Sequence, residues 1–308
     1  MVTIDTGFLR PAFDAAYLMV EGGRGAYIDC GTNHSVPAML AALTRQGLAP
    51  DAVDWLILTH VHLDHAGGAG ALMQQLPNAR LGVHPRGAPH MIDPARLIAG
   101  ATAVYGEAEM QRSYGRIVPV PAKRVQVIED GGEIDLAGRR LRCIDTPGHA
   151  RHHLCVWDEC SRSWFTGDTF GLSYREFDTA AGAFAVPTTS PVQFEPGPLK
   201  DSIGRMLSAD PEAMYVTHYG RVDDVQRLGA DLIAQIDAMV ALVLGLDPGP
   251  GRHAQLVLSL TALYQERAQA HGVVLDGASV QAVLGVDIEL NAQGLAVWAD
   301  RQAAGRSE

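Results

Sequence analysis

Three histidines and an aspartate lie within six residues of one another in the run Thr59–Gly68. They are His60, His62, Asp64 and His65. The run follows Trp55–Leu58, an apolar stretch that predicts a short buried strand. Neutral imidazole binds zinc and its first-row neighbours, whereas carboxylate oxygen favours harder ions. The pattern therefore predicts a metal site with mixed nitrogen and oxygen ligands at the end of this strand.

Three further ligand-type side chains follow later strand-like runs. His149 comes shortly after a run that ends at Ile144, and Asp168 and His218 directly follow two later runs. A single histidine at a strand end is usually structural or exposed. Several such residues at the ends of separate strands can converge on one edge of a sheet, which is how rigid scaffolds build metal sites. We therefore expect these residues to join the first cluster.

Strand-like and helical runs alternate over roughly the first 220 residues. Strands are predicted at 17–20, 26–30, 54–59, 80–84, 125–128, 133–136, 139–145, 153–157, 163–166 and 213–217. Helices are predicted at 35–46, 68–76 and 197–208. Strands that are joined partly by hairpins and partly by helical crossovers indicate a layered α/β body.

The strand pattern ends near residue 221. Apolar residues at helical spacing predict a helix over 225–244, a second helix is expected over 253–270, and shorter helices are expected from Ser279 and from Asp287. The Pro- and Gly-rich segment 247–251 interrupts the helical pattern. We predict a catalytic domain over residues 1–220 and an α-helical extension over 221–308, which offers a surface for a homodimer.

Composition argues against several classes of protein. The 308 residues are 47% hydrophobic and 19% charged, which is typical of a globular chain. A formal net charge of −11 argues against binding to nucleic acid, and no apolar stretch or N-terminal signal indicates a membrane or secretion. The four cysteines form no close pair, which fits a reducing compartment. We expect a cytoplasmic protein that binds neither nucleic acid nor membrane.

The pattern His60-x-His62-x-Asp64-His65, followed by the three later residues, resembles the ligand signature of the metallo-β-lactamase superfamily. The resemblance includes the strand and turn at 28–31 and covers roughly residues 15–220 in motif order. It implies an α/β fold, the four-layer αββα metallo-β-lactamase sandwich, with a dinuclear metal site at one edge. The helical tail would follow as a C-terminal extension.

The resemblance also implies a role for each ligand position. It assigns His60, His62 and His149 to the first metal, Asp64, His65 and His218 to the second, and Asp168 to a bridge between them. The implied cofactors are two divalent metal ions, with zinc as the first choice and iron or manganese as alternatives.

The implied activity is that of a metal-dependent hydrolase. Two divalent cations lower the pKa of a shared water toward neutrality, and one of them polarises the carbonyl group under attack. Asp64 would orient the hydroxide or carry its proton to the leaving group, in addition to binding metal. We expect attack of metal-bound hydroxide on an ester-like acyl bond of a small-molecule substrate, which is a thioester, an ester or a lactone.

Related families leave alternatives open. The chain resembles glyoxalase II in its helical extension, but the segment after Asp168 lacks the Gly-Cys-Gly element of the glutathione site. His62 stands where flavodiiron-type reductases have a glutamate. Persulfide dioxygenases use a single iron and lack the full set of second-site ligands, whereas His218 is present here. An iron-dependent oxidoreductase on the same fold, diiron or persulfide-dioxygenase-like, remains the first alternative. A binding protein with a vestigial site is the second, although the full ligand set argues against it.

The connection 170–198 is long and rich in aromatic residues and proline. Long loops within compact domains often bind ligands, so it either walls an apolar substrate pocket or packs against the helical tail or a dimer partner. Quorum-signal lactonases use a tyrosine near the bridging aspartate, which makes Tyr174 a candidate. The full set of candidate substrate-binding residues is Tyr174, Arg175, Phe177 and Tyr219. His152 and His153 are expected to support or pack against the site.

Overall fold

The computed structural model describes residues 1–305, and the chain divides into two compact units. The first unit contains Met1–Asp145, His152–Gly167 and Met214–Arg221. The second contains Thr146–Arg151, Asp168–Ala213 and the residues from Val222 onward. The predicted extension, residues 221–308, thus begins with Arg221 in the first unit, and its described residues from Val222 onward lie in the second unit, together with two segments from the first 220 residues. A functional division at residue 220 stays a prediction.

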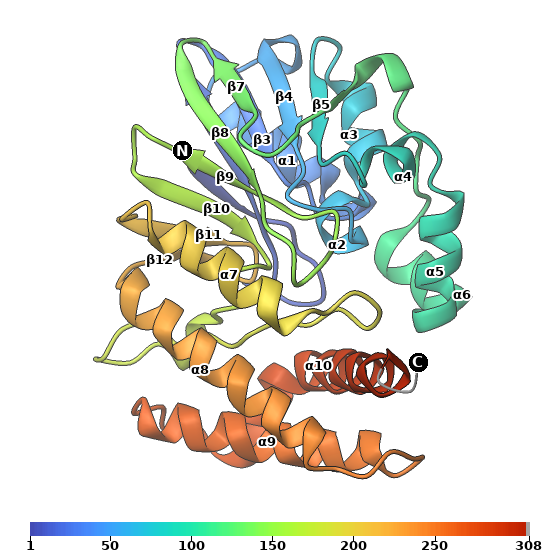
Figure 1. Ribbon diagram of the computed structural model, residues 1–308. Coiled ribbons are helices and arrows are strands. Elements are labelled where there is room, and N and C mark those ends of the chain that lie inside the picture. Colours follow the sequence, from blue (N-terminus) through green and yellow to red (C-terminus); the bar gives the residue numbers. More distant parts are fainter. Residues whose placement is uncertain (306–308) are drawn as a thin grey trace. The chain divides into compact units, whose positions relative to one another are not determined.

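The first sheet lies in the first unit (Figure 1). In spatial order its strands are β1 (Val2–Asp5), β2 (Ala15–Glu21), β3 (Arg24–Ile28), β4 (Val53–Ile57), β5 (Arg80–Val83) and β6 (Val125–Val127). The strands from β1 to β3 pair antiparallel, and those from β3 to β6 pair parallel. Gly22 and Gly23 have positive φ and form the two-residue turn between β2 and β3, a conformation that suits a tight hairpin.

The second sheet also has six strands, in the spatial order β12-β11-β10-β9-β8-β7. They are β7 (Glu133–Leu136), β8 (Arg139–Asp145), β9 (Leu154–Asp158), β10 (Ser163–Gly167), β11 (Ala213–Val216) and β12 (Gly220–Val222). The strands from β7 to β10 pair antiparallel along the chain. All ten predicted strands are found, whereas β1 and β12 were not predicted.

Two apolar clusters hold the first unit together. Between the sheets, the ring of Tyr17 from β2 lies 5.2 Å from that of Phe165 from β10, within a cluster that also buries Ile57 and Ile134. On the other face of the first sheet, a second cluster includes the buried sides of α1 (Val36–Arg45), α3 (Ala69–Gln75) and α4 (Ala88–Ile92). The remaining helical segments of this unit are Asn33–Ser35, Pro50–Ala52, α2 (Leu63–Ala66), α5 (Ala95–Tyr105), α6 (Glu107–Glu109), Met110–Tyr114 and Ala122–Arg124.

The second unit is mainly helical. It contains a short turn at Arg175–Phe177 and the helices α7 (Pro196–Leu207), α8 (Val225–Leu244), α9 (Arg252–Ala270) and α10 (Gly277–Gly305). Buried side chains from the last three helices, such as Leu232, Leu260 and Leu284, form its core. The predicted α/β sandwich with C-terminal helices is therefore confirmed. No helix within residues 1–305 is long and apolar enough to cross a membrane.

The prediction of two short helices from Ser279 and Asp287 is wrong, because α10 is continuous through both positions. The segment contains no proline, and a glycine inside a helix costs only about 1 kcal/mol relative to alanine. Val280, Leu284 and Ile288 are buried at a spacing of four residues, so one apolar stripe continues past Gly285. Packing on the other helices therefore outweighs the local cost of glycine.

A buried ion pair joins β8 to β9. Asp158 is completely buried, and Arg139 Nε donates to its Oδ1 across 2.9 Å. Ser161 Oγ donates to the same carboxylate. Burial by itself raises the pKa of the Asp158 carboxyl group, but the hydrogen bonds from Arg139 and Ser161 outweigh it and hold the pKa below its ordinary value.

We predict that Asp158→Asn lowers the free energy of unfolding at pH 7 by about 3 kcal/mol, because Arg139 would stay largely buried without its main counter-charge. A depressed pKa stabilises the folded state above the unfolded pKa, and this stabilisation is lost as the pH falls through the folded pKa. The difference between the wild type and the variant should therefore shrink below about pH 4. Urea denaturation at several pH values measures it.

Glu21→Gln is the matched control, because Glu21 also pairs with Arg139, at 3.2 Å, but is exposed. This change should cost less than about 1 kcal/mol. An equal loss from both variants, or a difference between the wild type and Asp158→Asn that is undiminished at pH 3, would contradict the prediction.

Candidate metal centre

The loop after β4 carries the first four predicted ligands. β4 ends at Ile57, and the chain then continues without helix or strand to His62, which is the N-cap of the short helix α2. Asp64 and His65 therefore lie on the first turn of this helix. His60 and His65 are completely buried, whereas His62 and Asp64 are partly exposed. The turn from strand to helix thus places four ligand-type side chains within a short length of chain.

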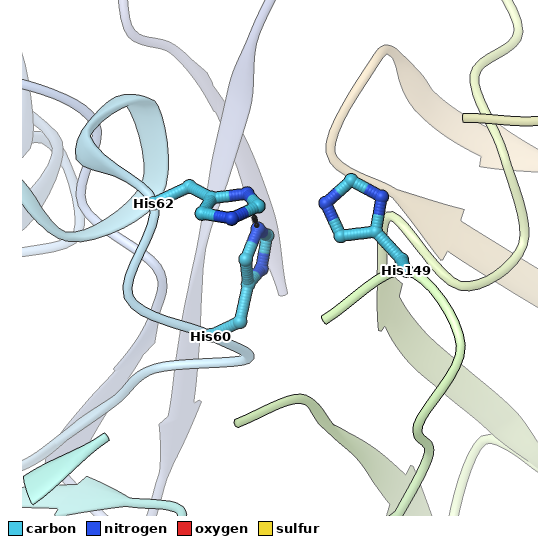
Figure 2. A group of neighbouring side chains, drawn as sticks. All are labelled: His60, His62 and His149. Atoms are coloured by element: carbon cyan, nitrogen blue, oxygen red, sulfur yellow. Dashed lines mark hydrogen bonds between the residues drawn. The ribbon is translucent and has the colours of Figure 1, made fainter. Parts of the chain in front are cut away.

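His60 and His62 face each other through ring nitrogens. His60 Nε2 lies 2.9 Å from His62 Nδ1 (Figure 2). Thr59 Oγ1 donates its only proton to Asp29 Oδ2 across 2.7 Å, so the hydroxyl can only accept from His60 Nδ1, which is 3.2 Å away. His60 Nδ1 therefore carries the ring proton, and Nε2 presents a lone pair. Two ring nitrogens this close require a proton or a cation between them.

Asp29 fixes the orientation of His65. This buried carboxylate follows β3, and it accepts hydrogen bonds from the Thr59 backbone N at 2.8 Å and from Thr217 Oγ1 at 3.3 Å. His65 Nδ1 lies 3.0 Å from Asp29 Oδ2. Because the carboxylate accepts, His65 Nδ1 is the donor and Nε2 keeps its lone pair. A carboxylate behind a ligand histidine is a common support of metal sites.

Asp64, His65 and His218 form a group whose ligand atoms all lie within 4.8 Å of one another. Asp64 Oδ2 is 3.7 Å from His65 Nε2 and 3.6 Å from His218 Nε2. His218 follows β11, and its Nδ1 donates to the backbone carbonyl of Phe13 across 2.9 Å, which leaves its Nε2 with a lone pair. Two donor atoms on one tetrahedral zinc ion lie about 3.3 Å apart. The spacing and the donor set therefore fit a single metal ion.

His149 and Asp168 lie together in the second unit. His149 Nε2 is 3.4 Å from Asp168 Oδ2, and both residues are buried. Thr188 Oγ1 donates to the Asp168 backbone carbonyl across 2.9 Å and lies 3.1 Å from His149 Nδ1. Since the hydroxyl has one proton, it must accept from His149 Nδ1, and the lone pair of His149 is at Nε2. Figure 2 draws this ring together with those of His60 and His62.

The structure therefore contains the seven predicted ligands in two groups. The first unit carries His60, His62, Asp64, His65 and His218, and the second carries His149 and Asp168. Four of the five histidines have Nδ1 held by an oxygen atom of the chain, so that Nε2 offers a lone pair. Metal ligation requires a neutral ring with a free lone pair, and these four rings have one held in place at Nε2.

Several supporting residues could not be identified from the sequence. Asp29 lies in the strand and turn at 28–31 that the sequence singles out, but Thr188 and the carbonyl of Phe13 carry no recognisable signal. Asp14 was also missed: burial raises the pKa of its carboxyl group to about 7, against the opposing effects of His218, His65 and the hydrogen bond from Thr6. Almost any oxygen atom of the chain can accept the ring proton of a histidine. The residue type alone therefore does not identify which residue is the acceptor.

Two further histidines pack against the first pair. The ring of His153 stacks on that of His60, with centroids 4.8 Å apart, and the ring of His152 meets that of His62 edge-on at 5.5 Å. Burial, together with His62 and two more histidines nearby, lowers the pKa of His152. Both residues thus take the packing role that was expected of them.

The four candidate substrate-binding residues have varied surroundings. Tyr174 and Phe177 are buried, and Tyr174 Oη lies 3.4 Å from Asp287 Oδ1 of α10. Arg175 donates to the backbone carbonyl two residues before it. Tyr219 is half-buried and packs against the cluster between the two sheets. Their contact with a substrate stays a prediction.

The connection 170–198 packs against the helical tail within the second unit. Thr179 Oγ1 donates to the carbonyl of His271 at 3.0 Å, and Arg227 Nη2 donates to the carbonyl of Ala183 at 2.9 Å. Nearer its end, Arg301 Nη2 donates to the carbonyl of Phe194 at 2.8 Å. The tail-packing alternative is therefore confirmed for this segment, and its role in a substrate pocket stays open to test.

Known proteins share both the sequence pattern and the fold. The chain is 28% identical over 222 residues to the metallo-beta-lactamase fold-containing protein ST1585 of Sulfurisphaera tokodaii, which covers 69% of this chain and 75% of that protein. It is 27% identical over 164 residues to hydroxyacylglutathione hydrolase of Klebsiella pneumoniae, which covers 51% of this chain and 50% of that protein. The match thus spans about half the length of that hydrolase.

Solved structures agree at the level of the fold. The crystal structure of ST1585 from Sulfolobus tokodaii has a TM-score of 0.69 at 24% identity and covers 96% of this chain and 97% of its own. The metallo-beta-lactamase family protein TTHA1429 from Thermus thermophilus has a TM-score of 0.65 at 24% identity, over 84% of this chain and 86% of its own. The family model of the metallo-beta-lactamase superfamily matches residues 10–218, a range that includes every predicted metal ligand. The chain therefore belongs to the metallo-β-lactamase superfamily.

Proposed function

We propose that this chain is a dinuclear metal-dependent hydrolase of an ester-like acyl bond. The observation that carries the proposal is the common orientation of His60, His65, His149 and His218, whose Nε2 lone pairs are set by oxygen atoms behind the rings. Membership of a superfamily that includes hydrolases supports it, as do relatives named hydroxyacylglutathione hydrolase. The substrate would be a small thioester, ester or lactone.

The proposed ligand sets combine the two groups of residues. His60, His62 and His149 would hold one cation, Asp64, His65 and His218 the other, and Asp168 would be shared. Five imidazoles and two carboxylates suit zinc first, and iron or manganese second. Bound cations would supply a Lewis acid and lower the pKa of water toward neutrality.

Asp64 is the carboxylate that we propose for proton transfer. It is partly exposed, with 24% of its side chain accessible, whereas His65 and His218 on either side of its Oδ2 are buried. A carboxylate at this border can accept a proton from an attacking water and deliver it to a leaving group. The buried rings keep bulk water away from the metal-facing atoms.

The cellular setting is part of the proposal. The net charge of −11 supports a small-molecule substrate over a nucleic acid, because phosphate backbones are bound by basic surfaces. The absence of close cysteine pairs supports a cytoplasmic location. We also propose the helical tail as the surface through which a homodimer would form.

The first prediction is a metal content of about two ions per chain, with zinc in excess of iron and manganese, measured by elemental analysis of protein expressed with all three metals. His149→Ala should lower the content, whereas Arg151→Ala, an exposed change two residues later, should not. Iron with a visible absorption band and no acyl turnover would favour an oxidoreductase instead. A protein that binds no metal would refute the proposal.

We next predict that Asp64→Asn lowers kcat/KM by at least about 100-fold, because proton transfer by a positioned side chain contributes that much or more. Turnover is measured on a panel of thioesters, aryl esters and lactones. Asp51→Asn, at an exposed turn before β4, is the control and should keep wild-type activity. Retention of full activity by Asp64→Asn on every substrate would exclude this role.

Asp29→Asn should weaken metal binding by about 10–100-fold, the usual effect of removing a support behind a ligand histidine. The amide oxygen could still accept from the Thr59 backbone, but the amide nitrogen would face His65 Nδ1 and oppose its proton. Competition with a chromophoric chelator measures the affinity, and thermal unfolding shows whether the fold survives. A folded variant with wild-type affinity would show that Asp29 is not needed.

A further inference from the structure

A buried asparagine of the helical tail binds the chain on both sides of Thr188. Asn291 lies in α10 and is 1% exposed. Its Oδ1 accepts from the backbone N of Thr189 at 2.7 Å, and its Nδ2 donates to the backbone carbonyl of Pro187 at 2.9 Å. The side-chain amide thus makes one hydrogen bond to the backbone on each side of residue 188, in the way that a neighbouring β-strand would. These two hydrogen bonds fix the backbone at residue 188.

The amide of Asn291 can adopt only one orientation. Its second Nδ2 proton goes to Tyr264 Oη at 2.9 Å, so both donors and the oxygen are used. If the amide oxygen and nitrogen were exchanged, the amide N–H would face the backbone N–H of Thr189, and the amide oxygen would face the carbonyl oxygen of Pro187. Neither pair could form a hydrogen bond. Tyr264 Oη lies 3.4 Å from Met239 Sδ, so α8, α9 and α10 all contribute to this arrangement.

Gly294 lets α10 come close enough for this contact. It lies one turn after Asn291, and a Cβ atom there would be 2.2 Å from Thr189 Oγ1 and 3.0 Å from the carbonyl oxygen of Ser190. Any other residue would push the helix away from the segment. Two positions of α10 are thus fitted to the same short stretch of chain.

Thr188 connects this stretch to the predicted metal ligands. Its hydroxyl donates to the backbone carbonyl of Asp168 and accepts from His149 Nδ1. Movement of the Thr188 backbone would therefore disturb both residues and release the ring proton of His149 from its acceptor. All of these contacts lie within the second unit.

We propose that Asn291 is a positioning residue for His149 and Asp168, and that the helical tail acts through it to set the tautomer of His149. The proposal rests on the metal-binding role proposed above for these two residues. Asn291 touches neither of them and acts through the backbone of residues 187–189. The tail is therefore part of the machinery of the metal centre.

The test uses the full-length chain with Asn291→Leu, which keeps the approximate volume and removes every hydrogen bond of the amide. In metal-free protein, long-range ¹⁵N–¹H spectra of the histidine rings should show His149 with its proton on Nδ1 in the wild type and a mixture of tautomers in the variant. Zinc affinity, measured by chelator competition, should fall about 10–100-fold. A merely structural role would lower thermal stability and leave both signatures unchanged.

Two further variants keep the test decisive. Gln293→Ala is the matched control: Gln293 lies on the same helix and bonds Glu289 one turn away, so neither signature should change. Tyr264→Phe removes one hydrogen-bond partner of Asn291 and keeps the buried ring, and it should shift the tautomer in the same direction by a smaller amount. If Asn291→Leu fails to fold, Tyr264→Phe is the variant on which the tautomer and the zinc affinity are measured.

The outcomes separate this proposal from the proposed function. Wild-type tautomer and zinc affinity in both Asn291→Leu and Tyr264→Phe would overturn the positioning role, whatever the substrate. A wild-type protein that binds zinc but hydrolyses no acyl substrate would refute the proposed hydrolase activity. The positioning role would then be decided by the tautomer spectra alone.

Discussion

A neutral imidazole ring can offer a lone pair at Nε2 only while its proton is on Nδ1, and a hydrogen-bond acceptor beside Nδ1 favours that tautomer. The centre of this protein depends on that constraint. A carboxylate serves His65, a backbone carbonyl serves His218, and hydroxyl groups serve His60 and His149. Each hydroxyl is itself committed, because its own proton goes to an oxygen atom that can only accept.

The architecture follows from the need to hold these acceptors still. Asp29 stands at the end of β3, and Thr59 follows the neighbouring parallel strand, so two strand ends meet at one carboxylate. Fully buried side chains between the sheets leave the strands little freedom to shift. In the second unit, where His149 and Asp168 lie on irregular chain, we propose that hydrogen bonds from Asn291 of α10 have the role that the sheet has in the first.

The sequence predicts the parts of this structure that have a period or a characteristic residue type. All ten predicted strands occur, since alternating apolar runs between turn residues are a strong signal. The ligand-type residues stand out because histidine and aspartate are concentrated after strands. Strand β1, which pairs along β2 at the edge of its sheet, was missed because Ile4 is the only one of its four side chains that is buried, so no apolar run marks it.

The acceptors behind the ligands were largely invisible for a different reason. Thr188 and the carbonyl of Phe13 act through atoms that many residues possess, so their roles depend on three-dimensional placement. Asn291 is further removed, because it is about a hundred positions from the backbone that it holds. The continuous α10 was likewise hidden, since its stability past Gly285 comes from packing that local propensity does not report.

The position of Asn291 after every predicted ligand in the sequence has a consequence for biosynthesis. A protein is made from its N-terminus, and its early segments begin to fold while the later ones are still being added. Every predicted ligand, from His60 to His218, is synthesised before α10 exists. A nascent chain therefore holds every predicted ligand before it holds the residue that we propose to orient one of them, so the proposed centre would be completed only after α10 has been made and packed.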